Sequence, residues 1–425
     1  MKYKKIKRMA AVLCFFTVCT LTIHSVCRLL ERKESHVEYS QFWENPGDYD
    51  VWLLGTSHVR RSMQVMELWK DYGIYSYSLA AASSYITQTY WTFMNALDYG
   101  TPKVVVMDCY KTGNDAKISS SSIVERMHTG MDSIPFSRTK VQMVMDLFES
   151  PAQRMEFLFN FYIYHNRWEE LGPEDFRPES SPFKGCRIIS NVQDLSGYHL
   201  IDQSDRSCED TVGFRYLRKI IEECQKRDIS IVLTAVPCCL EDEIQRSMNG
   251  AADMAQEYGV PFLNMSYDEA LDLDYQVDFS DKSHLNWLGA QKSTDYMGKY
   301  LTTHYDLSTP DASQDRESRW GRDYIRYQDA KRKLLQQEPR LDAYLVWLSD
   351  EAYTCDIYQS DSQILQSDPI LAKLLGKVHS SHSITRQEAR NMLGKKITGD
   401  VVFCVKDAQH GYIVDKAVFK DRRRK

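Results

Sequence analysis

Short apolar runs alternate with amphipathic segments over residues 50–301 of the chain. Apolar runs of about four to eight residues predict buried strands, and segments whose apolar residues recur at helical spacing predict helices. The predicted strands are 50–54, 75–80, 104–108, 229–236 and 261–264, and the predicted helices are 63–72, 88–98, 210–227, 242–258 and a last helix that ends at 301. Strands that alternate with helices in this way favour an α/β domain built on a parallel sheet.

The alternation stops between about residues 110 and 210. Aromatic residues at helical spacing are followed there by turn-rich polar pieces, so we interpret this part as a helical insertion into an α/β domain that covers residues 31–307. A sugar could stack on the aromatic run 157–168, but a buried amphipathic helix is the interpretation that we favour.

A separate unit is expected at the C-terminal end of the chain. Residues 308–321 are rich in Ser, Asp, Arg and Pro, which is typical of a linker. Residues 322–425 then predict a small α+β module of unknown role, in which no catalytic motif occurs. Its predicted elements are a charged helix over 322–337, strands over 343–348 and 355–359, and a hairpin that pairs 400–405 with 411–419.

The first 30 residues have the pattern of a membrane segment. Five Lys or Arg residues precede the apolar stretch 9–26, which has roughly the 18 to 20 residues needed to span a bilayer. The basic residues predict a cytoplasmic N-terminus and place the chain after Arg28 outside the cytoplasm. A cleaved signal peptide is the alternative, but residues 27–31 lack the small-x-small site that signal peptidase requires, which favours an uncleaved anchor.

Composition and charge narrow the possible functions. The formal net charge of the 425-residue chain is -6, so the chain lacks the basic surface typical of nucleic-acid-binding proteins. Its eleven cysteines show no metal-site spacing, and we interpret the pair Cys238 and Cys239 as packing residues. No phosphate-binding or dinucleotide-binding motif occurs, so we expect chemistry without a cofactor.

Ser57 is the candidate nucleophile. It follows the first predicted strand across Gly55 and Thr56 and precedes a helix, so its hydroxyl is expected at the carboxyl edge of the sheet, with its backbone N–H at a helix N-terminus. A serine that attacks an ester needs this exposure, a base to take its proton and backbone donors for the oxyanion. A helix cap is the structural alternative for a serine at this position.

Asp281 and His284 supply the expected acid and base. They lie in one loop before the last predicted helix, three residues apart, so the carboxylate can accept from Nδ1–H of the imidazole. The other ring nitrogen then faces Ser57 as general base. A surface pair without chemistry is the alternative.

The two ends of this constellation resemble a known family. Gly55-Thr56-Ser57 and Asp281-x-x-His284-Leu-Asn-x-x-Gly-Ala are similar to the first and last blocks of the SGNH (GDSL-type) hydrolase superfamily. The membrane segment and the Gly-Thr-Ser-His variant resemble its cell-envelope branch, which includes proteins that act with polysaccharide O-acylation and teichoic-acid D-alanylation systems. The resemblance implies a flavodoxin-like three-layer parallel sheet, with nucleophile, acid and base at Ser57, Asp281 and His284.

The middle blocks of the family are less clear in this chain. The glycine that donates to the oxyanion has no counterpart in 79–84, where the backbone N–H of Ala82 or Ser83 can take its place, and we choose Ser83. The family's asparagine should follow the strand 104–108 directly, but Asn114 comes several residues later. Loss of one oxyanion donor costs on the order of 100- to 1000-fold in rate.

Two classes of function follow from these observations. The first is a membrane-anchored serine esterase or O-acyltransferase that acts on acyl esters of an extracytoplasmic envelope glycan, and the sequence does not choose between water and a sugar hydroxyl as acceptor. The resemblance implies that such a protein works beside a polytopic membrane acyltransferase. The second is a non-catalytic scaffold or glycan-binding protein of a polysaccharide assembly, against which the intact Ser57, Asp281 and His284 argue.

Overall fold

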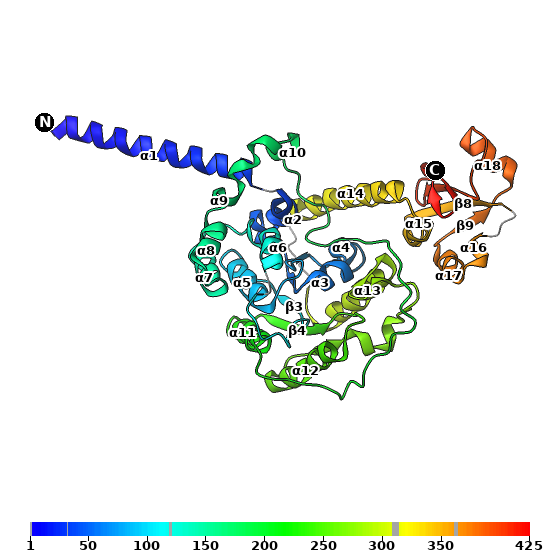
Figure 1. Cartoon of the computed structure of the whole chain (residues 1–425), viewed down its shortest axis with the longest axis horizontal. Coiled ribbons are helices and arrows are strands. Elements are labelled where there is room, and N and C mark those ends of the chain that lie inside the picture. The colour runs from blue at the N-terminus through cyan, green and yellow to red at the C-terminus, as the bar shows by residue number, and fades with distance from the viewer. Residues whose placement is uncertain (1, 32, 119–120, 308–313, 361–363) are drawn as a thin grey trace.

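The computed structural model describes residues 2–31, 33–118, 121–307, 314–360 and 364–425. The helix α1 (Lys2–Leu30) projects from one end of the molecule, and the C-terminal module lies at the other end (Figure 1). One helix, spanning Tyr3–Leu30, is long and apolar enough to cross a membrane. A second helix, α2 (Lys33–Glu44), connects α1 to the α/β domain.

A five-stranded parallel sheet forms the centre of the α/β domain. Its strands are β1 (Val51–Leu54), β2 (Ser76–Ser78), β3 (Val104–Asp108), β4 (Ser230–Ala235) and β5 (Phe262–Asn264), in the order β2-β1-β3-β4-β5. All four pairings are parallel. The predicted α/β class, the parallel sheet and the five strand positions are therefore confirmed.

Helices cover the sheet, and all but the short α3 bury several apolar side chains. The helices of the domain are α3 (Ser57–Ser62), α4 (Val65–Tyr72), α5 (Ile86–Leu97), α11 (Val212–Lys226), α12 (Asp242–Tyr258) and α13 (Trp287–His304). In α11 the side chains of Phe214, Leu217 and Ile221 recur at helical spacing and are buried in the core with the strands. The helix α5 packs beside α11, and α13 packs beside α3 and α4.

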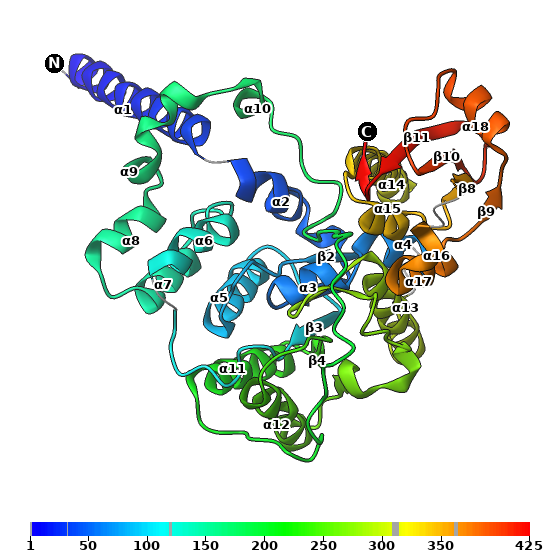
Figure 2. The same cartoon turned by 45° about the vertical axis from the view of Figure 1, so that its right-hand side comes forward.

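The insertion consists of short helices followed by a long irregular segment. Its helices are α6 (Ser121–Met131), α7 (Arg138–Leu147), α8 (Pro151–Leu158), α9 (Phe161–Tyr164), η2 (His165–Glu170) and α10 (Pro173–Phe176). Figure 2 shows α6, α7 and α8 as a group beside α2 and α5, with α10 apart from them near the end of α1. Phe157 is buried, but four other aromatic residues of 157–168 are exposed, so the expectation of one buried amphipathic helix is wrong. The reason is that residues 157–168 form three short helical pieces instead of one helix.

The helix α14 (Gln314–Gln337) joins the two units, and it begins inside the segment that was expected to be a linker. Residues 314–321 are helical because Trp320 packs into the core of the α/β domain, whereas Leu335 at the other end packs into the core of the module. The remaining linker residues, 308–313, lie outside the described part of the chain.

The C-terminal module is an α+β unit, and its core also includes Val277, Trp287 and Leu288 of the α/β domain. Its strands are β8 (Tyr353–Gln359), β9 (Ser381–Ser383), β10 (Val401–Asp407), β11 (Ile413–Lys420) and β12 (Arg423–Arg424), and its helices are α15 (Leu341–Trp347), α16 (Ile364–Ser367), α17 (Pro369–Lys377) and α18 (Arg386–Leu393). The strands β10 and β11 pair antiparallel, which confirms the predicted hairpin. The strand predicted over 343–348 is wrong, because this segment belongs to helix α15.

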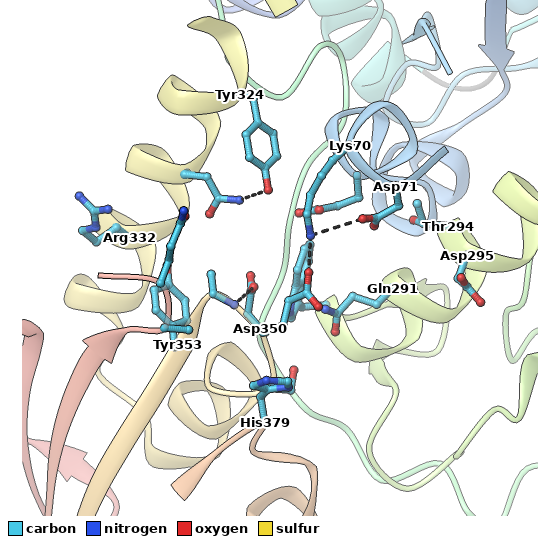
Figure 3. Close-up of a pocket in the computed structure, with 18 of the residues that line it drawn as sticks. Lys70, Asp71, Gln291, Thr294, Asp295, Tyr324, Arg332, Asp350, Tyr353 and His379 are labelled. Atoms are coloured by element: carbon cyan, nitrogen blue, oxygen red, sulfur yellow. Dashed lines mark hydrogen bonds and ion pairs between the residues drawn. The ribbon is translucent and has the colours of Figure 1, made fainter. Parts of the chain in front are cut away.

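A polar cavity of about 730 Å³ lies between the α/β domain, α14 and the module (Figure 3). Beside it, Lys331 is buried and its Nζ lies 2.9 Å from Glu67 of α4 and 2.5 Å from Asp350 of the module. The same ammonium lies 4.5 Å from the ring centroid of Trp287 in α13. A buried cation between two carboxylates therefore ties the two units together.

Candidate active site

Ser57 lies at a sharp turn between β1 and α3. Gly55 has φ +146°, and a Cβ there would come within 2.8 Å of the Cβ of Asp108 and 2.9 Å of Cγ2 of Val59. Only glycine therefore fits this turn. The hydroxyl of Thr56 accepts from the backbone N–H of His58 and caps α3, which makes Ser57 the first residue of the helix.

The imidazole of His284 connects Ser57 to Asp281. Its Nε2 lies 2.8 Å from Oγ of Ser57, and its Nδ1 lies 2.8 Å and 2.9 Å from the two carboxylate oxygens of Asp281. With Nδ1–H donating to the carboxylate, Nε2 accepts the proton of the hydroxyl. The structure thus brings the three predicted residues together from opposite ends of the domain.

Asp281 is held as a carboxylate by its neighbours. Burial raises its pKa, but the hydrogen bonds from His284 and from the backbone N–H of Ser283, with the nearby guanidinium of Arg61, outweigh burial and lower the pKa below its usual value. The guanidinium of Arg61 lies 3.7 Å from the carboxylate. Arg61 was not identified from the sequence, although its position four residues after Ser57 places both on one face of α3.

The loop that carries Asp281 and His284 is held by two short strands that pair antiparallel, β6 (Phe279–Asp281) and β7 (His284–Leu285). Asn286 then caps α13, because its side chain accepts from the N–H groups of Leu288 and Gly289. The amide of Asn286 also donates to the carbonyl of Val277 at 2.7 Å. This accounts for the asparagine in the His-Leu-Asn motif.

Gly289 lets α13 approach the same loop closely. A Cβ at Gly289 would lie 2.5 Å from the carbonyl oxygen of Asp278. The buried carboxylate of Asp278 accepts from Nζ of Lys292 at 2.8 Å and from the backbone N–H of Asp274 at 2.7 Å. Asp278 therefore positions the loop and does not contact the three site residues.

A second histidine, His58, packs against the ring of His284. His58 is buried, its ring stacks on Tyr110 at 4.0 Å, and it meets the ring of His284 edge to face at 5.5 Å. Burial, followed by the charges of His284 and Lys111, lowers the pKa of His58 to about 3, so this ring is neutral at pH 7. His58 therefore serves as an uncharged packing surface for His284.

Lys111 brings a positive charge to this side of the site. It adopts φ +73°, and its Nζ lies 4.8 Å from the ring centroid of Tyr110 and 5.5 Å from that of Tyr85. Neither Tyr110 nor Lys111 was identified from the sequence. The signal available was their position directly after β3, at the edge of the sheet where Ser57 lies.

The predicted oxyanion residue Ser83 lies in a turn next to the nucleophile turn. The N–H of Ala81 donates to the carbonyl of Gly55 at 3.2 Å, and the N–H of Ser84 donates back to Ala81. Ser83 has φ +56°, and its hydroxyl accepts from Arg126 at 3.3 Å. Within the described part of the chain, the backbone N–H groups of Ala82 and Ser83 donate to no protein acceptor.

Asn114 is placed differently. Its N–H donates to the carbonyl of Lys111, and its own carbonyl accepts from Gly213 at the start of α11. Asn114 lines a cavity of about 210 Å³ with residues of α12 such as Ser247, and Ser57, Asp281 and His284 are not among the lining residues. Between described residues, no hydrogen bond or ion pair joins Asn114 to these three.

No protein-family model matches this chain, and neither the curated proteins nor the solved structures contain a match. The class of protein is therefore defined by the fold and the geometry of the site. It is an α/β protein with a five-stranded parallel sheet, in which a serine, a histidine and an aspartate are hydrogen-bonded in series at the end of β1.

Proposed function

We propose that the protein is a serine esterase or O-acyltransferase of the SGNH type that is anchored in the membrane by α1. The observation that carries this proposal is the series of hydrogen bonds from Oγ of Ser57 to Nε2 of His284, and from Nδ1 of His284 to Asp281, each 2.8 Å at its shortest. This is the arrangement that activates a serine hydroxyl for attack on an acyl carbon.

The reaction proceeds through an acyl-enzyme. Oγ of Ser57 attacks the acyl carbon while its proton passes to Nε2 of His284, and the backbone N–H groups of Ser57 and of Ala82 or Ser83 stabilise the oxyanion. Collapse of the tetrahedral intermediate expels the alkoxide, which takes the proton from Nε2. Water or a glycan hydroxyl then gives a proton to Nε2 and attacks the acyl carbon, and Oγ leaves and regains its proton.

Other features support this proposal. The strand order β2-β1-β3-β4-β5 matches that of flavodoxin-like sheets, in which ligands bind at the carboxyl ends of the strands, and Ser57 follows the end of β1. The basic residues before the apolar part of α1 favour a cytoplasmic N-terminus and an extracytoplasmic α/β domain. The proposed substrate is an acyl ester of an envelope glycan, and a polytopic membrane acyltransferase is the proposed source of acyl groups.

Turnover of a small activated ester tests the proposal. The full-length protein in mild detergent is expected to hydrolyse p-nitrophenyl acetate, and Ser57→Ala is expected to reduce kcat/KM by at least about 10⁴-fold. Ser62→Ala is the matched control, because Ser62 lies in the same helix, is buried and has no hydrogen-bond partner for its hydroxyl among the described residues. Equal rates for wild type and Ser57→Ala would contradict the proposal.

The same assay separates hydrolysis from transfer. Addition of methyl glucoside as a soluble acceptor is expected to give an acetylated sugar if the acyl-enzyme accepts a hydroxyl, and free acetate alone if it accepts only water. Chromatographic separation of the two products gives the partition ratio directly.

A further inference from the structure

Three helices of the insertion, α9, η2 and α10, pack around the outer end of α1. The most apolar 18-residue window of α1 is not buried, whereas Leu30 at its end is buried. Nη1 of Arg167 donates to the carbonyls of Leu30 and Glu31 at 2.7 Å each, and the amide of Asn160 donates to the carboxylate of Glu31. Figures 1 and 2 both show α9 and α10 flanking this end of α1.

The length of α1 indicates where the bilayer would end. The apolar stretch 9–26 rises about 27 Å as a helix, close to the thickness of a bilayer's hydrocarbon core, which is about 30 Å. The hydrocarbon therefore ends near Val26, about one helical turn before Leu30. The insertion contacts α1 through η2, α9 and α10 at the level where lipid headgroups would begin.

This same part of the insertion exposes large aromatic side chains. We call Phe159, Phe161, Tyr162, Trp168 and Phe176 the aromatic surface, and their exposed fractions are 54%, 46%, 55%, 64% and 64%. Five large aromatic residues so exposed within one short segment indicate a surface that contacts something other than water. Tryptophan and tyrosine are enriched at the level of lipid headgroups, where an amphipathic ring contacts both apolar chains and water.

We propose that the aromatic surface lies in the headgroup layer of the bilayer that α1 spans, and so holds the α/β domain against the membrane at a fixed orientation. The inference rests on the membrane anchor of the proposed function. Continuity with α1 favours lipid over a protein partner, because a bilayer that surrounds residues 9–26 necessarily reaches the residues packed around Leu30. Exposed charges of both signs lie beside the aromatic surface, Glu169 and Glu170 next to Trp168 and Arg177 next to Phe176, so the proposed contact does not depend on anionic lipid.

Tryptophan fluorescence can test this in the full-length protein, because the chain offers a natural probe. Among its eight tryptophans, Trp168 is exposed and the other seven are buried or half-buried, and α1 contains none. The protein is reconstituted into vesicles of phosphatidylcholine, or of phosphatidylcholine brominated at shallow acyl-chain carbons. Bromine quenches indole emission at short range, so brominated lipid is expected to remove roughly an eighth of the emission, the share of one tryptophan in eight.

Trp168→Phe is expected to abolish this quenching while retaining an apolar ring. Trp43→Phe, which removes a half-buried tryptophan of α2, is the matched control and is expected to leave the quenching unchanged. Absence of quenching in the wild type, or equal quenching in Trp168→Phe, overturns the inference and leaves the aromatic surface for a protein partner. Resistance to alkaline extraction reports separately on the anchor, so a protein that stays in the membrane without quenching contradicts the lipid contact alone.

Discussion

The two sides of the candidate site are built in different ways. On the acid–base side, Asp281, His284 and Asn286 lie within six residues, and their hydrogen bonds are made largely inside one loop. On the oxyanion side, the turn with Ser83 and the residues after β3 come from separate segments of the chain, which the sheet brings together. Chemistry that is local in sequence can be recognised from the sequence, whereas chemistry assembled across the sheet cannot.

Of these two sides, the acid–base side should give the larger loss of activity when one of its groups is removed. Asp281→Asn should reduce kcat/KM for an activated acyl ester by on the order of 10³- to 10⁴-fold, because an amide no longer fixes the tautomer of His284 or stabilises its cation. Asp272→Asn is the matched control. Asp272 lies nine residues before Asp281 and has φ +48°, which asparagine tolerates. A loss below tenfold for Asp281→Asn would mean that this carboxylate has no role in activating His284.

Arg61→Gln should have a smaller effect that depends on pH. Arg61 helps to keep the pKa of Asp281 low, so its removal raises that pKa and the carboxylate is protonated at a higher pH. The acid limb of the pH profile of kcat/KM should therefore shift to higher pH, while activity at pH 8 changes little. Lys282→Gln removes one positive charge from an exposed side chain of the same loop and should leave the profile unchanged, whereas an identical shift in both variants would point to net charge alone.

The smallest expected effect belongs to Ser83→Gly. Glycine accepts φ +56° and keeps the backbone N–H, but it removes the hydroxyl and its contact with Arg126. If the oxyanion donor is the backbone, kcat/KM should stay within about twofold of the wild type. A loss of about 100-fold would instead assign the donor role to the hydroxyl and make the two sides of the site more alike.

The fold was predictable where a strand is fully buried. The strands β1, β3 and β4 are continuous apolar runs, and their predicted bounds agree with the structure to within about one or two residues. The sequence predicts a strand where helix α15 lies, because a short apolar run gives no periodicity that separates a buried helix from a buried strand. The sequence does not predict the start of α14, because the first residues of this helix are polar and only Trp320 among them packs into the core of the α/β domain.

The site was predictable only in part, because some of its supporting contacts are made by the backbone or by residues far apart in the sequence. The irregular end of the insertion supports the histidine loop through backbone contacts. The carbonyl of Ile189 accepts from Trp287, and the N–H of Gln193 donates to Phe279. Backbone hydrogen bonds of this kind do not require particular side chains, so they cannot be predicted from the residue types. Arg61 acts on Asp281 across 220 residues of chain, and only its spacing from Ser57 could have suggested it.

Covalent labelling tests directly whether Ser57 is the nucleophile. The full-length protein would be treated with a fluorophosphonate, digested and mapped by mass spectrometry. We predict one phosphonylated residue, Ser57, with labelling lost in His284→Ala because no base remains to take the hydroxyl proton. A folded wild type that stays unlabelled, or a label on another serine, would contradict the assignment of Ser57 as the nucleophile.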